Sequence, residues 1–138
     1  MSEITNFFKQ NKKLKANTTY TATKSLTDES GVPLLWEIKP ITTKENDKLQ
    51  ESCMIDIPGK NFRQKMNTTE YIRKLIVASV VFPDLLDADL QDSYGVNKAE
   101  DLVQEIVDDS GEWNAFVQFI NDFNNFVQIQ DKIDEAKN

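Results

Sequence analysis

The sequence contains no histidine, so it lacks the side chain most often used for acid–base catalysis near neutral pH and for metal binding. Its single cysteine, Cys53, excludes an intrachain disulfide and any metal site that needs several thiolates. We expect Cys53 to be a small buried residue rather than a reactive thiol. The four glycines stand singly, so no glycine-rich phosphate-binding loop can form. These absences lead us to expect no cofactor, no metal and no catalytic residues.

Acidic residues are plentiful, but their arrangement does not favour catalysis or calcium binding. Pairs such as Asp108–Asp109 and Asp134–Glu135 are sequence neighbours, and neighbours on a helix point in different directions. We therefore interpret them as solvated surface rather than as a catalytic acid and base. None of the aspartates follows the spacing of a calcium-binding loop. The sequence thus predicts a protein that is not an enzyme.

Long apolar runs are missing as well. None reaches the roughly 18–20 residues that a membrane-spanning helix needs, and the N-terminus has no apolar signal segment. We therefore expect a cytoplasmic protein without a membrane partner. With 138 residues, of which 39% are hydrophobic, the chain can bury one core, so we expect one domain over residues 1–138. Residues 1–16 can form a mobile arm, and residues 128–138 are polar enough to fray.

Charge is divided between the two halves of the chain. Residues 1–75 contain 13 Lys and Arg against 9 Asp and Glu, a net charge of +4. Residues 76–138 contain 3 against 14, a net charge of −11. This acidic half argues against nucleic-acid binding, because phosphate contacts supply most of that affinity. The basic cluster Lys9, Lys12, Lys13 and Lys15 is either a solvated arm, which we favour, or a site for nucleic acid or an acidic partner. The apolar residues just before it, Ile4, Phe7 and Phe8, either dock on the body or belong to a free arm.

The first half of the chain predicts a β-hairpin. Residues 17–26 are rich in β-branched and aromatic residues, and residues 34–39 alternate between apolar and polar side chains. Turn residues fill positions 27–33 between them. We expect the two runs to pair with Trp36 on the buried face of the hairpin.

A helix and a second strand pair are expected next. Capping-box spacing at Thr42 predicts a helix over residues 43–52. Residues 54–57 and 62–66 can then pair as two short strands around a turn. An isolated pair of this size needs packing against something else to persist.

Helices are predicted through most of the second half. Asn67 can cap a helix over residues 71–82, whose apolar residues cover nearly its whole circumference and place it in the middle of the domain. Its β-branched content leaves open a buried strand over residues 76–82. Asn97 can cap a further helix that ends near Val107, with Leu102, Val103 and Ile106 facing inward.

Residues 80–96, V-V-F-P-D-L-L-D-A-D-L-Q-D-S-Y-G-V, form the most distinctive segment. Pro83 has no amide hydrogen, so it should end or kink a helix that arrives over residues 71–82. We expect Asp84 to cap a new short helix and Gly95 to supply its left-handed exit. The apolar face of that helix would consist of Leu86, Leu90 and Tyr94, opposite Asp87, Asp89 and Asp92. The segment predicts a corner between two helices, not a catalytic loop.

The last expected helix, residues 112–128, is unusually aromatic. At 100° per residue, its apolar residues spread over roughly half of the circumference, more than the stripe a little over 100° wide that core packing needs. The candidate partner-binding residues are Trp113, Phe116, Phe119, Phe123 and Phe126. Either the whole face is buried in the domain, which we favour, or Phe119 and Phe126 at one edge join an apolar patch that binds another protein.

Several segments resemble a known family. Residues 80–96, together with W-E-I-K-P-I-T-T-K-E at residues 36–45, are similar to the XkdN-like tail assembly chaperones of contractile-tailed phages and prophages. The opening F-F-K-Q-N-K-K at residues 7–13 and the closing E-A-K-N at residues 135–138 extend the resemblance over essentially the whole chain. The motif residues to which we assign structural roles are Trp36, Phe82, Pro83, Asp84, Asp92, Tyr94 and Gly95.

The resemblance implies a non-enzymatic role in the host bacterial cytoplasm. Tail assembly chaperones act on the tape measure protein, and they are thought to coat this long helical chain until tube subunits polymerise around it. They are absent from the finished particle. The implied partner is therefore the tape measure protein, with the tail tube protein and self-association as further candidates. The alternative is a structural tail completion protein or minor virion subunit. A small enzyme or nucleic-acid-binding regulator is disfavoured by the absent histidine and the negative charge.

Together these elements predict an α+β fold. An N-terminal β-hairpin or small antiparallel sheet would be followed by a C-terminal cluster of four to five α-helices.

Overall fold

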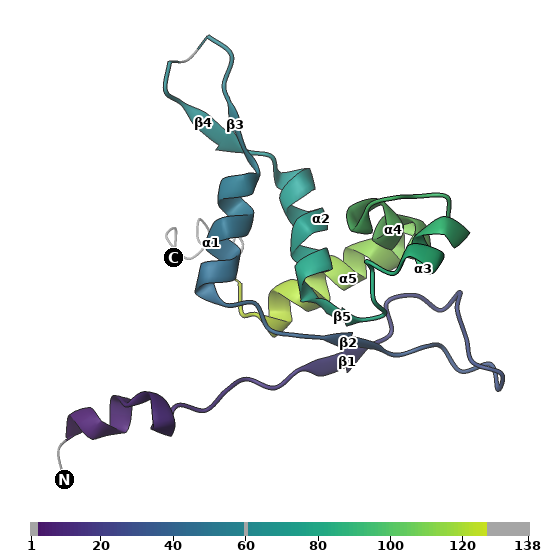
Figure 1. Ribbon diagram of the computed structural model, residues 1–138, viewed down its shortest axis with the longest axis horizontal. Helices are drawn as coiled ribbons and strands as arrows, with labels where there is room; N and C mark the ends of the chain where they lie inside the picture. The colour runs from purple at the N-terminus through teal and green to yellow at the C-terminus, as the bar shows by residue number, and fades with distance from the viewer. Residues whose placement is uncertain (1–2, 60, 127–138) are drawn as a thin grey trace, which may run out of the picture.

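The computed structural model describes residues 3–59 and 61–126, so the expected frayed tail at residues 128–138 lies outside the described residues. The fold is α+β, as predicted, with two small antiparallel sheets and several helices (Figure 1). In chain order the elements are the 3₁₀ turns η1 (Glu3–Phe7) and η2 (Lys9–Asn11), β1 (Thr18–Tyr20), β2 (Trp36–Ile38), α1 (Thr43–Ser52), β3 (Met54–Asp56), β4 (Gln64–Met66), α2 (Thr68–Ser79), β5 (Val80–Phe82), α3 (Ala88–Ser93), α4 (Ala99–Ile106) and α5 (Ser110–Phe123).

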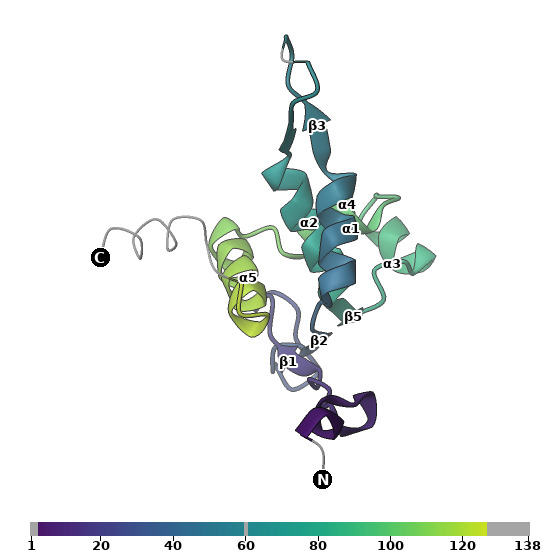
Figure 2. The same ribbon diagram turned by 90° about the vertical axis from the view of Figure 1, so that its left-hand side faces the viewer.

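The central sheet has the strand order β1-β2-β5, and both of its strand pairs are antiparallel. Tyr20 pairs with Trp36, which confirms the expected pairing of the two runs with Trp36 buried. The strands are shorter than expected, because residues 21–35 form a long connection with one bridge, between Thr27 and Pro33. Helices α1, α2 and α5 lie on one side of this sheet (Figures 1 and 2). Among the described residues, no α-helix covers the other side.

The buried helix ends earlier than predicted. Asn67 caps α2 as expected by accepting a hydrogen bond from the Glu70 amide, but α2 stops at Ser79. Residues 80–82 instead form β5, so the helix predicted over residues 71–82 is wrong for its last three residues. The alternative of a buried strand over residues 76–82 is correct for these three residues in being a strand, but it is wrong for residues 76–79, and Val81 and Phe82 are exposed. β2 offers a free edge here, and the Lys39 amide donates to the Ser79 carbonyl at 2.8 Å, so sheet pairing displaces the final helical turn.

In the corner after Pro83, the residue that caps the short helix is not the predicted one. The Asp84 carboxylate accepts a hydrogen bond from the Leu86 amide in a tight turn, and it does not cap a helix. Asp87 caps α3 by accepting from the Leu90 amide at 2.8 Å. Leu86 is 77% exposed, so its expected place on the inner face was wrong. The neighbouring Leu85 enters the core instead, which requires a turn before the helix can begin.

The rest of that corner follows the prediction. Leu90 and Tyr94 are half-buried against the core. Gly95 has a φ of 70°, which gives the left-handed exit that was expected of it.

The remaining helix boundaries are mostly set by local caps. α1 spans the predicted residues, and both hydrogen bonds of the capping box at Thr42 are present. α4 is preceded by Lys98 without a side-chain cap, so Asn97 does not cap it as predicted. Asp109 caps α5 by accepting from the Glu112 amide at 2.9 Å, which starts this helix before residue 112.

α5 also ends earlier than expected, at Phe123 rather than near residue 128. The side chain of Asn124 accepts a hydrogen bond from the Ile41 amide at 2.9 Å and donates one to the Ile120 carbonyl. Asn125 then has a φ of 59°, in the left-handed region, so the right-handed α-helix cannot continue through it. These interactions tie the end of the helix to the segment before α1.

Phe116 lies at the centre of the core and is 0% exposed. Its ring stacks on Tyr20 with centroids 5.4 Å apart and meets the edge of Trp36 at 5.6 Å. It therefore joins α5 to the first two strands. The predicted inward residues of α4 are buried, and so is Cys53, as expected. The main core cluster is Ala22, Trp36, Ile38, Leu75, Ile76, Leu85, Ala99, Leu102, Val103, Ile106, Val107, Phe116 and Ile120.

Replacing Phe116 should cost most of the stability of the domain. We expect Phe116→Ala to lower the free energy of unfolding by about 3–5 kcal/mol, because a buried ring is lost and a cavity remains. Urea denaturation followed by tryptophan fluorescence measures this. Phe7→Ala is the control, since Phe7 is 82% exposed and its replacement should change stability by less than about 0.5 kcal/mol. Equal effects of the two substitutions would contradict the central position of Phe116.

Candidate partner-binding surfaces

The described residues do not assemble an obvious chemical site. Within residues 3–59 and 61–126, no three Cys, Asp or Glu side chains are placed so that they could hold a metal ion. No helix in this part of the chain has the length and apolar content that crossing a bilayer demands. Attention therefore turns to surfaces that could bind another protein.

The five aromatic residues predicted to bind a partner occupy different environments. Phe116 is fully buried, so it cannot touch a partner while the domain is folded. The other four, Trp113, Phe119, Phe123 and Phe126, are half-buried and pack against the core. Of the two alternatives for this aromatic face, burial in the core is therefore correct for Phe116. A partner-binding role for the other four stays a prediction.

Stacked rings lead from the core towards the end of α5. Phe119 lies on Tyr20 with centroids 4.1 Å apart and planes 14° apart, and Phe123 stacks on Phe119 at 6.0 Å. The Lys15 ammonium lies 4.3 Å from the centroid of Phe123 and donates to the Phe123 carbonyl. A cation is favourable both on an aromatic face and at a helix C-terminus. Burial, and then the charge of Glu112, raise the pKa of Tyr20.

The family-motif residues mostly hold structural positions. Trp36 is in the core, and Pro83 and Tyr94 are half-buried. Asp84 makes a turn and Gly95 ends α3, while Asp92 is an exposed residue of α3. Phe82 differs from the others, because its backbone belongs to β5 but its side chain is 61% exposed.

Apolar side chains are exposed in three places, and sequence reasoning singled out only part of the first. The first is the arm, residues 3–16, which projects from the body (Figures 1 and 2). Lys15 at its base contacts Phe123, but its apolar side chains remain exposed. The second is the outer side of the central sheet with its adjoining loops. The third is the ribbon, residues 54–66, formed by β3 and β4. The exposed residues are Ile4, Phe7, Phe8 and Leu14 on the arm, Val32, Leu34, Leu35, Val81, Phe82 and Leu86 around the sheet, and Met54, Ile55 and Phe62 on the ribbon.

Two large apolar side chains of the central sheet region are exposed close to one carboxylate in the chain pairing. Phe82 pairs with Glu37, next to an irregularity in the register of β2 and β5, and its side chain is largely exposed. Leu35 precedes Glu37 by two residues and is exposed as well. Alternation in residues 34–39 identified the buried side of this strand, but it did not show that the opposite side is left uncovered.

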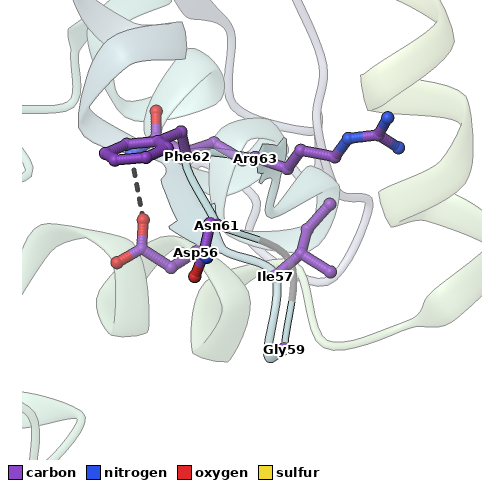
Figure 3. Close-up of a pocket in the computed structure, with 7 residues that line it drawn as sticks. Asp56, Ile57, Gly59, Asn61, Phe62 and Arg63 are labelled. Carbon is purple, nitrogen blue, oxygen red and sulfur yellow. Dashed lines mark hydrogen bonds between the residues drawn. The ribbon is translucent and has the colours of Figure 1, made fainter.

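The ribbon projects from the end of α1 and α2 into solvent (Figures 1 and 2). Every residue of β3 is exposed, and Phe62 near the tip is fully exposed with a φ of 63°. The predicted strand pair is present, but its strands cover residues 54–56 and 64–66 rather than 54–57 and 62–66. Figure 3 shows the residues around a shallow hollow at its tip, including Asp56, Ile57 and Arg63. The central sheet and the helices leave both faces of the ribbon uncovered.

Comparison with known proteins gives consistent matches over most of the chain. A family model described as Phage XkdN-like tail assembly chaperone protein, TAC, matches residues 4–137. The phage-like element PBSX protein XkdN of Bacillus subtilis (strain 168) is 22% identical over 118 residues, which cover 83% of this chain and 80% of that protein. The crystal structure of the protein YqbN is similar with a TM-score of 0.76 at 15% identity, covering 92% of this chain and 99% of that chain.

Substitution of Phe119 measures how much the half-buried aromatic residues of α5 stabilise the domain. We expect Phe119→Ala to lower the free energy of unfolding by about 2 kcal/mol, because a half-buried ring and its stack on Tyr20 are lost. Thermal and urea denaturation measure this, and Phe82→Ala, on the exposed side of β5, should cost less. A loss below about 0.5 kcal/mol for Phe119→Ala would show that the ring serves an interface and not the core.

Proposed function

The chain belongs to the family of phage XkdN-like tail assembly chaperones, and on that premise we propose that it binds the tape measure protein during tail morphogenesis. It holds this client until the tail tube assembles, and it makes and breaks no covalent bonds. The observation that carries the proposal is the family match over residues 4–137. The apolar surfaces exposed on the arm, the central sheet and the ribbon support it.

The distribution of these surfaces suits a client that is long and helical. Holding such a chain requires apolar contacts at several points, together with enough charge to keep the complex in solution. The three exposed regions supply the contacts, and the net charge of −7 supplies the repulsion between complexes. Release requires weak individual contacts, whose strength comes from many copies along one client.

The edge of α5 can contribute to the same role. Trp113, Phe119, Phe123 and Phe126 keep part of their rings in solvent while they support the core. We propose that a client reaches them next to the base of the arm, where Lys15 lies on Phe123. The tail tube protein and further copies of this chain are additional candidate partners.

Co-expression tests the client directly. We expect the chain to co-purify with the tape measure protein of the same phage at low and moderate salt, because apolar contacts survive moderate screening of charge. Affinity purification followed by gel electrophoresis measures this. An unrelated coiled-coil protein of similar length is the control and should not be retained. Failure of the tape measure protein to co-purify would contradict the proposed function.

The proposal also places the protein in the host cytoplasm and outside the mature virion. We therefore expect mass spectrometry of purified particles to detect it in trace amounts at most, with the tail tube protein as the internal standard. Detection in a fixed ratio to the tail tube protein would instead identify a structural tail completion protein or minor virion subunit.

A further inference from the structure

The two faces of the ribbon differ in chemistry. Paired residues of antiparallel strands project to the same side, and successive residues alternate. Ile55 pairs with Lys65, and the Ile57 amide extends the pairing by donating to the Arg63 carbonyl at 3.1 Å. Figure 3 shows Ile57 and Arg63 on one side of the ribbon and Asp56 on the other. We name the side that carries Ile55, Ile57, Arg63 and Lys65 the basic face.

The other face contains the ribbon's acidic group. It is formed by the pairs Met54–Met66 and Asp56–Gln64. The Asp56 carboxylate accepts a hydrogen bond from the Gln64 side-chain amide at 3.1 Å. Asp56 is the only acidic residue in the sequence between positions 54 and 66, where three basic residues occur. The basic face thus combines apolar and cationic side chains without a carboxylate of its own.

Within the described residues, nothing covers or neutralises the basic face. Ile55, Arg63 and Lys65 are exposed, and the ion pairs of the described chain involve other lysines, Lys39 and Lys74. A two-stranded ribbon with both edges in solvent is marginally stable by itself. An apolar strip on such a ribbon, next to free cations, is typical of a surface that a partner covers.

We propose that the basic face of the ribbon binds an acidic amphipathic α-helix of the tape measure client; this inference rests on the proposed function. Alternate residues on a strand lie about 6.6 Å apart, and carboxylates one helical turn apart are separated by about 5–6 Å. Two such carboxylates can therefore meet Arg63 and Lys65, while leucines or methionines on the same helix side cover Ile55 and Ile57. The guanidinium of Arg63 can bind its carboxylate through two hydrogen bonds.

A nucleic acid fits this face less well. Phosphate contacts account for most nucleic-acid affinity, and the isoleucines offer phosphate nothing. The net charge of −7 would also repel a nucleic acid at longer range. An amphipathic protein helix can pair its carboxylates with the two cations of the basic face and cover the two isoleucines with its apolar side chains.

The test compares two charge-reversal variants of the full-length chain. The ribbon variant is Arg63→Glu with Lys65→Glu. The matched control is Lys44→Glu with Lys48→Glu, which changes two exposed lysines of α1. Each replacement changes the charge by −2, so both variants go from −7 to −11. Circular dichroism melts check that both fold, which we expect because none of the four residues belongs to the core.

Binding is measured by fluorescence anisotropy with overlapping peptides that cover the tape measure protein of the same phage. We expect the wild-type chain to bind a peptide with an acidic amphipathic pattern, and the ribbon variant to bind it at least about tenfold more weakly. The control variant should change the affinity by less than about twofold, since its extra charge acts only at long range. A peptide with its acidic residues replaced by lysine should prefer the ribbon variant.

The outcomes separate this inference from the proposed function. If the full-length tape measure protein does not bind the wild-type chain, both are overturned. If the client binds but the ribbon variant binds it as tightly as wild type does, only the ribbon assignment is overturned. The same holds if the ribbon variant loses self-association in sedimentation while it keeps the client. Loss of binding to a duplex DNA probe, without a change in client binding, would identify a nucleic-acid surface instead.

Discussion

The packing of Phe116 against Tyr20 and Trp36 is the contact on which the rest of the molecule depends. It joins a helix near the end of the described chain to two strands near its beginning, so α5 and the sheet stabilise each other. Glu112, one turn earlier, reinforces this junction by accepting hydrogen bonds from the Thr23 hydroxyl and the Lys24 amide, both at 2.8 Å. Most of the aromatic surface of α5 is therefore needed inside the domain.

That requirement explains where apolar surface remains for a partner. In the part of the chain that the structure describes, the helices cover one side of the central sheet, and the arm, the other side of the sheet and the ribbon stay uncovered (Figures 1 and 2). These regions surround the core without belonging to it, so they can adapt to a client without loss of the fold. Their charges differ as well, because the arm and the ribbon are basic in an acidic chain. A long client could thus meet several weak sites of different character on one molecule.

Local chemistry made part of this structure predictable. Thr42 and Asn67 cap their helices with side-chain oxygens, and Trp36 is buried by simple alternation. The prediction errors arose where contacts between distant parts of the chain determine where a helix or strand begins and ends. β5 exists because β2 offers an edge, and α5 ends where the Asn124 side chain meets the Ile41 amide. The aromatic pattern of α5 identified a large apolar face, but only the position of β1 shows that Phe116 is internal. The exposure of the ribbon could not be predicted from the sequence either, because the pattern of residues does not show which strand pairs remain uncovered.

Hydrogen–deuterium exchange of the chain with and without its client tests the central claim most directly: the domain keeps its core intact and binds through the elements around it. Amides of the arm and of the ribbon should exchange more slowly in the complex, because a client that covers them restricts their opening. Amides of α4 and of the Phe116 turn of α5 should exchange as they do in the free protein. Slowing confined to α5, with the arm and the ribbon unchanged, would contradict the account.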